Sequence, residues 1–182
     1  MISSPKSPRL AIIAWLTLCV SQVVFSAETV YLDPADFLEQ ALPGCDRKAL
    51  WLDKETKRQI EKLLERPFPG ARVRYCQKEG KTGWILDEIG KTEPITSGIV
   101  VDRGRIERVR VLVFRESRGG EVHRDAFVRQ YEDASLREGK ALDRPIDGIT
   151  GATLSVYALN RQVKLALLFD GMVREEDRGE SK

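Results

Sequence analysis

Histidine is almost absent from this sequence, because His123 is the only one in 182 residues. A single histidine leaves too few ligands for a zinc or haem site, and it argues against a serine–histidine–aspartate hydrolase. The glycines do not form the strand–GxGxxG–helix pattern that binds dinucleotides. We therefore expect neither a metal centre nor an enzyme that itself takes hydride from a nicotinamide cofactor.

One long apolar run is present, at residues 10–25, between Lys6 and Arg9 on one side and Ser26 and Ala27 on the other. This order is typical of a secretory signal peptide, and a run of about sixteen residues is shorter than the roughly 20 that span a bilayer. The sequence therefore predicts export through a signal peptide at residues 1–26. A retained N-terminal membrane anchor is the less favoured alternative.

The basic excess of the chain belongs to that leader. The whole chain has 30 basic and 28 acidic side chains, and the leader contains two of the basic ones and no acidic one. The mature chain is therefore close to neutral. No basic stripe remains that would argue for nucleic acid as a partner.

Cysteine is scarce as well. Cys19 lies in the leader, so export leaves only Cys45 and Cys76. In an oxidising compartment such a pair predicts a structural disulfide, which would stabilise the fold by roughly 3–4 kcal/mol on chain-entropy grounds. Two separate buried thiols or a redox-active pair are the alternatives.

Hydrophobic periodicity and turn residues divide the rest of the chain into helices and strands. The predicted helices are residues 33–41, 53–65, 125–131 and 150–170. The predicted strands are residues 49–52, 71–77, 84–89, 95–102 and 106–114, and residues 136–144 are expected to be a polar loop. This order predicts an α+β single domain with a mostly antiparallel sheet packed against helices and a long C-terminal helix.

The most informative stretch is residues 147–153, Asp-Gly-Ile-Thr-Gly-Ala-Thr, which lead directly into the last predicted helix. With Thr150 as the N-cap, Gly151, Ala152 and Thr153 would be the first helical residues. The free backbone N–H groups and the helix dipole favour a phosphate there, and the small residues leave room for a bulky group. An ordinary capped helix with small residues for close packing is the alternative.

These residues resemble the flavinylation motif of the FMN-binding domain family, Asp-x-x-Ser/Thr-Gly-Ala-Thr/Ser. The family includes the C subunit of sodium-translocating NADH:quinone reductase and the G subunit of Rnf complexes. In that family a flavin transferase joins the phosphate of FMN to the last hydroxyl of the motif, so the resemblance implies covalent FMN on Thr153. The remaining motif residues would surround it: Asp147, Gly148, Thr150, Gly151 and Ala152.

Residues 109–116 also resemble a strand of the family that ends in a glutamate, here Glu116, although Ser-Arg-Gly-Gly follows where the family has Thr-Pro-Gly. The resemblance divides the mature chain into three parts. They are a helical and strand extension at 27–70, an FMN-binding domain at 71–172 and a charged, disordered tail at 173–182.

Two residues of the expected sheet region are candidates for contact with the flavin. Trp84 could stack on the ring, although plain core packing also explains it. Lys91 could offset charge on the phosphate or on a reduced ring, or it could be a solvated loop lysine.

Three further candidates come from small size or from the resemblance. Thr96 and Ser97, beside Gly98, would let the ring approach the backbone of a strand, although a β-bulge explains the glycine equally well. Glu116 is a candidate because of its place in the family's strand, although a surface glutamate at a strand end is ordinary.

The sequence thus favours an exported, periplasmic flavoprotein that carries electrons through FMN on Thr153. A flavin transferase would mature it, and a membrane or periplasmic redox protein would exchange electrons with it. One alternative is a flavin-dependent reductase of a small periplasmic substrate, with Glu116 or His123 as proton donor. The other is a non-redox binding module in which the motif only caps a helix.

Overall fold

The computed structural model of the protein describes residues 28–180, so the predicted signal peptide lies outside the described residues. Six strands form one antiparallel sheet in the order β1-β6-β5-β4-β3-β2. The strands are β1 (Thr29–Val30), β2 (Asp46–Trp51), β3 (Arg72–Lys78), β4 (Lys81–Ile89), β5 (Pro94–Asp102) and β6 (Arg105–Phe114).

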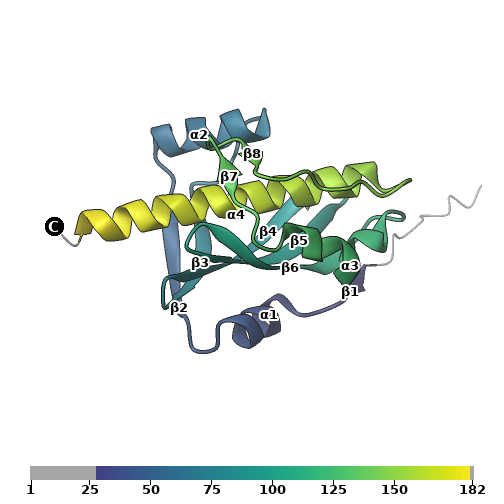
Figure 1. Cartoon of the computed structure of the whole chain (residues 1–182), viewed down its shortest axis with the longest axis horizontal. Coiled ribbons are helices and arrows are strands. Elements are labelled where there is room, and N and C mark those ends of the chain that lie inside the picture. Colours follow the sequence, from purple (N-terminus) through teal and green to yellow (C-terminus); the bar gives the residue numbers. More distant parts are fainter. Residues whose placement is uncertain (1–27, 181–182) are drawn as a thin grey trace, which may run out of the picture.

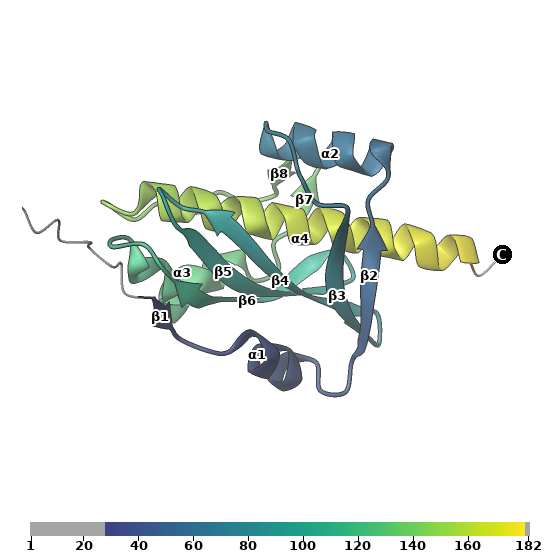
Figure 2. The same cartoon turned by 180° about the vertical axis from the view of Figure 1, so that it is seen from behind.

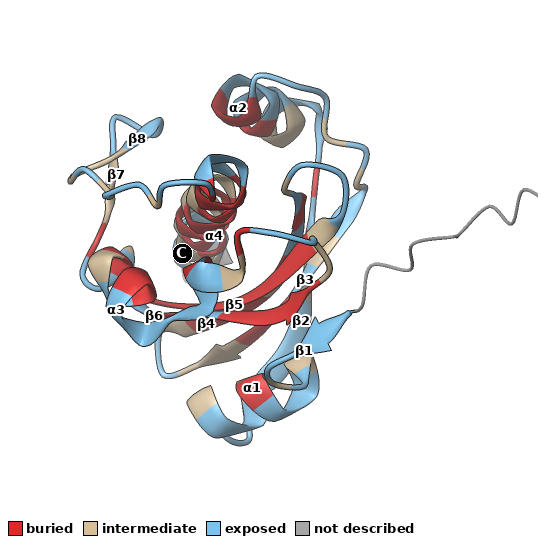
Figure 3. Cartoon of the chain, turned by 90° about the vertical axis from the view of Figure 1, so that its right-hand side faces the viewer, coloured by how far each residue is buried: buried red, intermediate tan, exposed pale blue. Residues whose placement is uncertain are grey.

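Helices lie on both faces of this sheet. The four α-helices are α1 (Pro34–Ala41), α2 (Lys54–Leu64), α3 (Asp125–Val128) and α4 (Thr153–Glu180). Two short 3-10 turns flank α3, at Gly120–His123 and Arg129–Tyr131. Figure 1 shows α4 across one face of the sheet with α2 above it, and α1 on the opposite face. The view from behind in Figure 2 shows the same layers, and the view along α4 in Figure 3 shows this helix between the sheet and α2.

The predicted fold class is confirmed, because the domain is α+β with an antiparallel sheet and a long final helix. Two predicted helix starts are confirmed as well. The carboxylate of Asp33 accepts from the N–H of Ala35 (2.7 Å), and that of Asp53 accepts from the N–H of Thr56 (2.7 Å). Both aspartates thus satisfy backbone donors that the first helical turn leaves free.

Two predictions about the second half of the chain are wrong. Residues 136–144 are not a plain loop, because β7 (Leu136–Arg137) pairs with β8 (Ala141–Leu142) in a small hairpin. The charged tail is also not disordered up to residue 180, because α4 continues to Glu180. Val173 explains this extension, since its side chain is buried in the main core and holds the helix to the sheet.

The main core lies between the sheet and α4. One face of the last helix forms an apolar stripe, because Leu159, Val163 and Ala166 have no exposed surface and belong to this core. They pack against side chains of the central strands such as Ile99. Since α4 contacts β4, β5 and β6, burial of this stripe fixes the helix along the sheet.

Two buried carboxylates fix α4 further. Glu88 of β4 binds Arg66, which follows α2 (2.6 Å), and Arg161 of α4 (2.8 Å). Asp170 of α4 accepts from the hydroxyl of Thr82 in β4 (2.8 Å) and from Arg174 (2.8 Å). Because a buried charge is costly unless it is paired, both carboxylates define where the helix lies on β4.

The opposite face of the sheet is covered in part by α1. Phe37 of α1 is buried against β5, where a Cβ atom on Gly98 would lie 2.5 Å from two carbons of the Phe37 ring. The glycine therefore makes room for an aromatic ring of the protein itself.

Cys45 and Cys76 form a disulfide with a Cα–Cα distance of 5.6 Å, so they are not two separate buried thiols. It links the segment after α1 to β3. No helix within residues 28–180 is long and apolar enough to cross a lipid bilayer.

The contact between Gly98 and Phe37 gives a test of the fold. We expect Gly98→Ala to lower the free energy of unfolding by about 1–3 kcal/mol in urea titrations, because the added methyl group overfills this site. The control is Gly171→Ala in α4, where a Cβ would meet no atom within 4 Å. This control should keep or slightly raise stability. Equal stability of Gly98→Ala and the unchanged protein would contradict the packing described.

Candidate functional site

The last helix begins later than the sequence predicts. Gly151 has a φ of +82°, a left-handed conformation, and α4 begins at Thr153. The N–H of Ala152 donates to the carbonyl of Ile149 (2.9 Å), so residues 149–152 form a turn before the helix. The prediction of Thr150 as N-cap is therefore wrong, because a left-handed residue cannot be the first residue of a right-handed helix.

Thr153 is exposed at the first position of α4. Within residues 28–180, the backbone N–H groups of Thr153, Leu154 and Ser155 donate no hydrogen bond. These donors and the positive end of the helix dipole therefore lie around the Thr153 hydroxyl. A Cβ at Gly148 or Gly151 would meet no atom within 4 Å, so the space in front of the turn is open. The site has the donors and the room that a phosphate ester requires.

The turn itself is anchored on its inner side. Ala152 is buried, and Ile149 packs against the main core. The N–H of Asp147 donates to the side-chain oxygen of Gln130 (2.8 Å), while the Asp147 side chain is exposed. The exposed motif residues are thus held by buried neighbours rather than by contacts of their own.

The loop after β6 lies against the motif. Gly119 in this loop has a φ of +86°, and a Cβ there would lie 2.5 Å from the hydroxyl oxygen of Ser155 and 3.4 Å from the Cβ of Ala152. Only glycine fits both the backbone conformation and this close approach. The loop that follows the family-like strand is therefore in direct contact with Ala152 of the motif and with Ser155.

A cavity of about 520 Å³ lies beside the motif, between this loop, the end of β1 and the turn before α4. Its volume is within the range of small-molecule sites. Arg118 and Arg124 bring positive charge to it, and Glu121 brings negative charge. Thr150 and Gly151 of the motif line it, and Thr153 lies just outside its lining. Two arginines suit the recognition of a phosphate group.

An aromatic pair forms one wall of this cavity. Tyr31 stacks on His123, with ring centroids 4.2 Å apart and an angle of 10° between the rings. The N–H of Tyr31 donates to the carbonyl of Leu112 (2.8 Å), which holds Tyr31 at the end of β1. Burial, and then the charge of Glu121, raises the pKa of Tyr31, so its hydroxyl is protonated at neutral pH.

Tyr31 was not found from the sequence, because it lies more than a hundred residues before the motif and no local pattern marks it. Figures 1 and 2 show how the fold brings the parts together, with β1, the loop after β6, the β4–β5 turn and the start of α4 at one end of the molecule.

Glu116 lies at this end, but its carboxylate binds the protein. It accepts hydrogen bonds from the N–H groups of Lys91, Thr92 (2.6 Å) and Glu93 (2.9 Å) in the β4–β5 turn. Burial alone would raise the pKa of Glu116, but these backbone donors together lower it below its ordinary value. Glu116 is therefore an ionised carboxylate that fixes the turn.

Lys91 lies in the same turn with an exposed side chain, while its N–H is bound by Glu116. The side chain does not line the cavity beside the motif.

Trp84 does not line that cavity either. It has no exposed surface, and its ring lies between those of Tyr75 (centroids 4.9 Å apart) and Phe169 (5.3 Å apart). Its indole N–H donates to the hydroxyl of Thr82 (2.8 Å). Core packing, one of the two interpretations of Trp84, accounts for all of its contacts.

Thr96, Ser97 and Gly98 are buried in β5. The hydroxyl of Thr96 donates to Asp87 and accepts from Arg115 (2.9 Å). Ser97 has no exposed surface, and a β-bulge separates it from Thr96. The ring that approaches Gly98 is that of Phe37. None of these three residues lines the cavity beside the motif.

The role of Glu116 can be tested through the pH dependence of stability. We expect Glu116→Gln to lower the melting temperature at neutral pH, because the three N–H groups lose a charged acceptor. Since the folded-state pKa of Glu116 is lowered, its contribution is present above the ordinary glutamate pKa of about 4.3 and is lost as the pH falls through the lower folded value. The difference between variant and unchanged protein should therefore shrink in acid.

The matched control is Glu93→Gln, an exposed glutamate of the same turn that takes part only through its backbone N–H and carbonyl. Its melting temperature should follow that of the unchanged protein at every pH. A constant difference for Glu116→Gln between neutral and acid pH would show that its charge does not stabilise the turn.

Comparison with known proteins agrees with this geometry. A family model described as "FMN-binding domain" matches residues 90–168, a segment that contains the β4–β5 turn, Glu116 and the whole of the motif at 147–153. Comparisons with curated proteins and with solved structures gave no match. Residues 90–168 of the chain therefore match the FMN-binding domain family.

Proposed function

We propose that this protein is an exported flavoprotein that carries electrons through FMN joined by a phosphoester to Thr153. The observation that carries the proposal is the exposed hydroxyl of Thr153 at the first position of α4, inside the segment that matches the FMN-binding domain family. A flavin transferase would be needed to form the ester.

The residues around Thr153 would hold such a group in distinct ways. The free N–H groups of the first helical turn, with Arg118 and Arg124, would offset the negative charge of the phosphate. Tyr31 and His123 would offer a flat surface to the ring system. Gly148 and Gly151 would keep the approach to the hydroxyl free of side chains.

When bound, FMN supplies the redox chemistry, and the protein supplies its placement and surroundings. Covalent attachment has a physical advantage outside the cytoplasm, where a flavin that dissociates is lost by dilution. Export is supported by the layout of residues 1–27, which is that of a signal peptide, and by the disulfide between Cys45 and Cys76. A periplasmic or membrane redox protein would then exchange electrons with the flavin.

One observation favours a carrier over a reductase that protonates a small substrate. Glu116 is held as a carboxylate by three N–H groups and has a lowered pKa, so it is a poor proton donor at neutral pH. His123 is the remaining candidate, and its ring lies against that of Tyr31.

The attachment can be tested by intact-mass measurement after co-expression with a flavin transferase. The unchanged protein should carry an added mass of one FMN minus one water, and Thr153→Ala should lack it because the attacking hydroxyl is gone. Thr153→Ser is the matched control, since it keeps a hydroxyl at the same position. An adduct that persists in Thr153→Ala would rule out Thr153. Colourless protein from the native host would instead favour a module in which the motif only caps a helix.

The position of the ring can be tested by flavin fluorescence, which a stacked tyrosine quenches. We expect Tyr31→Leu to raise the fluorescence of the flavinylated protein several-fold toward that of the unfolded sample, with an unchanged mass. Tyr157→Leu is the control, because Tyr157 is also exposed and lies one turn after Thr153, but does not line the cavity. A rise for Tyr157→Leu alone would place the ring on the other side of the helix.

A further inference from the structure

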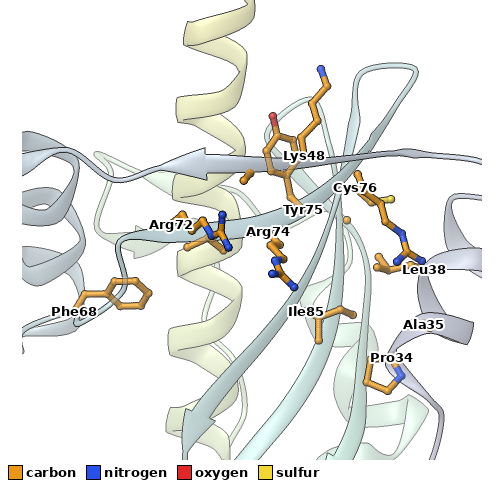
Figure 4. Close-up of a pocket in the computed structure, with 14 residues that line it drawn as sticks. Pro34, Ala35, Leu38, Lys48, Phe68, Arg72, Arg74, Tyr75, Cys76 and Ile85 are labelled. Carbon is orange, nitrogen blue, oxygen red and sulfur yellow. The ribbon is translucent and has the colours of Figure 1, made fainter.

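A second and larger cavity lies on the sheet face that carries α1, away from residues 147–153. It has a volume of about 950 Å³ and opens between β3 and β4. These strands pair only from Tyr75 to Lys78 along β3, and the earlier part of β3 diverges from β4. Figure 4 shows the resulting groove, with Phe68 at one end, Leu38 at the other and Ile85 on the β4 side.

Basic side chains line the groove together with apolar ones. Arg47 of β2 and Arg72 and Arg74 of β3 lie on one face of the β2–β3 pair, because alternate residues of paired strands share a face. Figure 4 shows Arg72 and Arg74 directed into the groove. None of the 14 residues that line it is acidic.

These arginines differ from others in the protein. Arg66, Arg115 and Arg161 each form an ion pair with a carboxylate. No ion pair within the described residues includes Arg47, Arg72 or Arg74. The charges in the groove are therefore available to an anionic ligand.

Trp51 adds an aromatic surface next to these charges. Its side chain is 65 % exposed, although it is one of the largest apolar side chains of the protein. The guanidinium carbon of Arg72 lies 5.4 Å from the centre of the Trp51 ring, a cation–π contact. Tryptophan and arginine are among the residue types that most often carry the binding energy at protein–protein interfaces.

The spacing of the cations indicates the form of the ligand. Arg72 and Arg74 are two residues apart on one strand, which separates them by about 7 Å, and the face from Arg47 to Trp51 extends over roughly 13 Å. A single phosphate is too small to reach all of these groups. An extended polypeptide has the same spacing of about 7 Å between alternate side chains, and unlike a flat membrane surface it can enter a groove.

We propose that this groove binds an extended, acidic segment of a protein partner. Alternate acidic side chains would contact Arg72 and Arg74 on the β3 side of the groove. The apolar side chains between them, which point the opposite way along an extended chain, would contact Ile85 and Leu38 on the other side. The proposal does not depend on attachment of FMN, because no residue that lines the groove belongs to the motif or to the cavity beside it.

The test uses the full mature protein and a labelled ten-residue peptide of alternating glutamate and leucine. We expect the peptide to bind, with amide shift changes in NMR spectra confined to β2, β3, β4, the segment 68–71 and α1, and with weaker binding as salt is raised. Arg72→Gln with Arg74→Gln should weaken binding about tenfold or more, because charged hydrogen bonds are lost.

The matched control is Lys54→Gln with Lys62→Gln on α2, two exposed cations outside the groove. This control should bind the peptide as the unchanged protein does. The proposal is overturned if the peptide does not bind, if its shift changes lie elsewhere, or if the arginine variant binds equally well. Binding to phosphatidylglycerol vesicles through Arg72 and Arg74, without binding of the peptide, would assign the groove to a membrane surface instead. If the arginine variant does not fold, the shift changes in the unchanged protein decide.

Discussion

The structure depends on how α4 is held along the sheet. Hydrophobic burial holds the helix against β4, β5 and β6, but because it is non-directional it does not alone fix the rotation of the helix or its position along its axis. Glu88 and Asp170 supply the direction, because each buried carboxylate needs partners at fixed positions: Glu88 reaches Arg161 of α4, and Asp170 of α4 reaches Thr82 of β4. The two contacts are nine residues apart on the helix, so they fix both its rotation and its position along its axis.

This placement sets the geometry of the candidate site. With the helix fixed, Ala152 and Ser155 face inward against Gly119, and Thr153 between them faces outward. The Glu116 carboxylate meanwhile holds the β4–β5 turn at the same end of the sheet. The segments around the exposed Thr153 hydroxyl are thus held in place by contacts with one another. Their positions do not depend on a bound ligand. A cofactor added after folding would meet a site that already exists.

The sequence was sufficient to predict those features that depend on residues close together in the chain. Asp33 and Asp53 predicted two helix starts, alternation predicted the central strands, and residues 147–153 predicted the family. It was insufficient where tertiary packing decides. Trp84 has the same local pattern whether it faces a ligand or the core, and only Tyr75 and Phe169 on its two sides settle that it faces the core. The pairing of Tyr31 with His123 joins segments that no sequence period connects.

The segment that matches the family model contains most of the candidate site. Thr153, Glu116 and the arginines of the smaller cavity all lie within residues 90–168. Every residue of the basic groove lies before that segment, and so does Tyr31. The N-terminal part is nevertheless no separate unit, because β4 pairs with β5 and β1 pairs with β6 in the same sheet. Tyr31 in the wall of the smaller cavity, and every residue that lines the larger groove, therefore come from the part of the chain that the family model does not match.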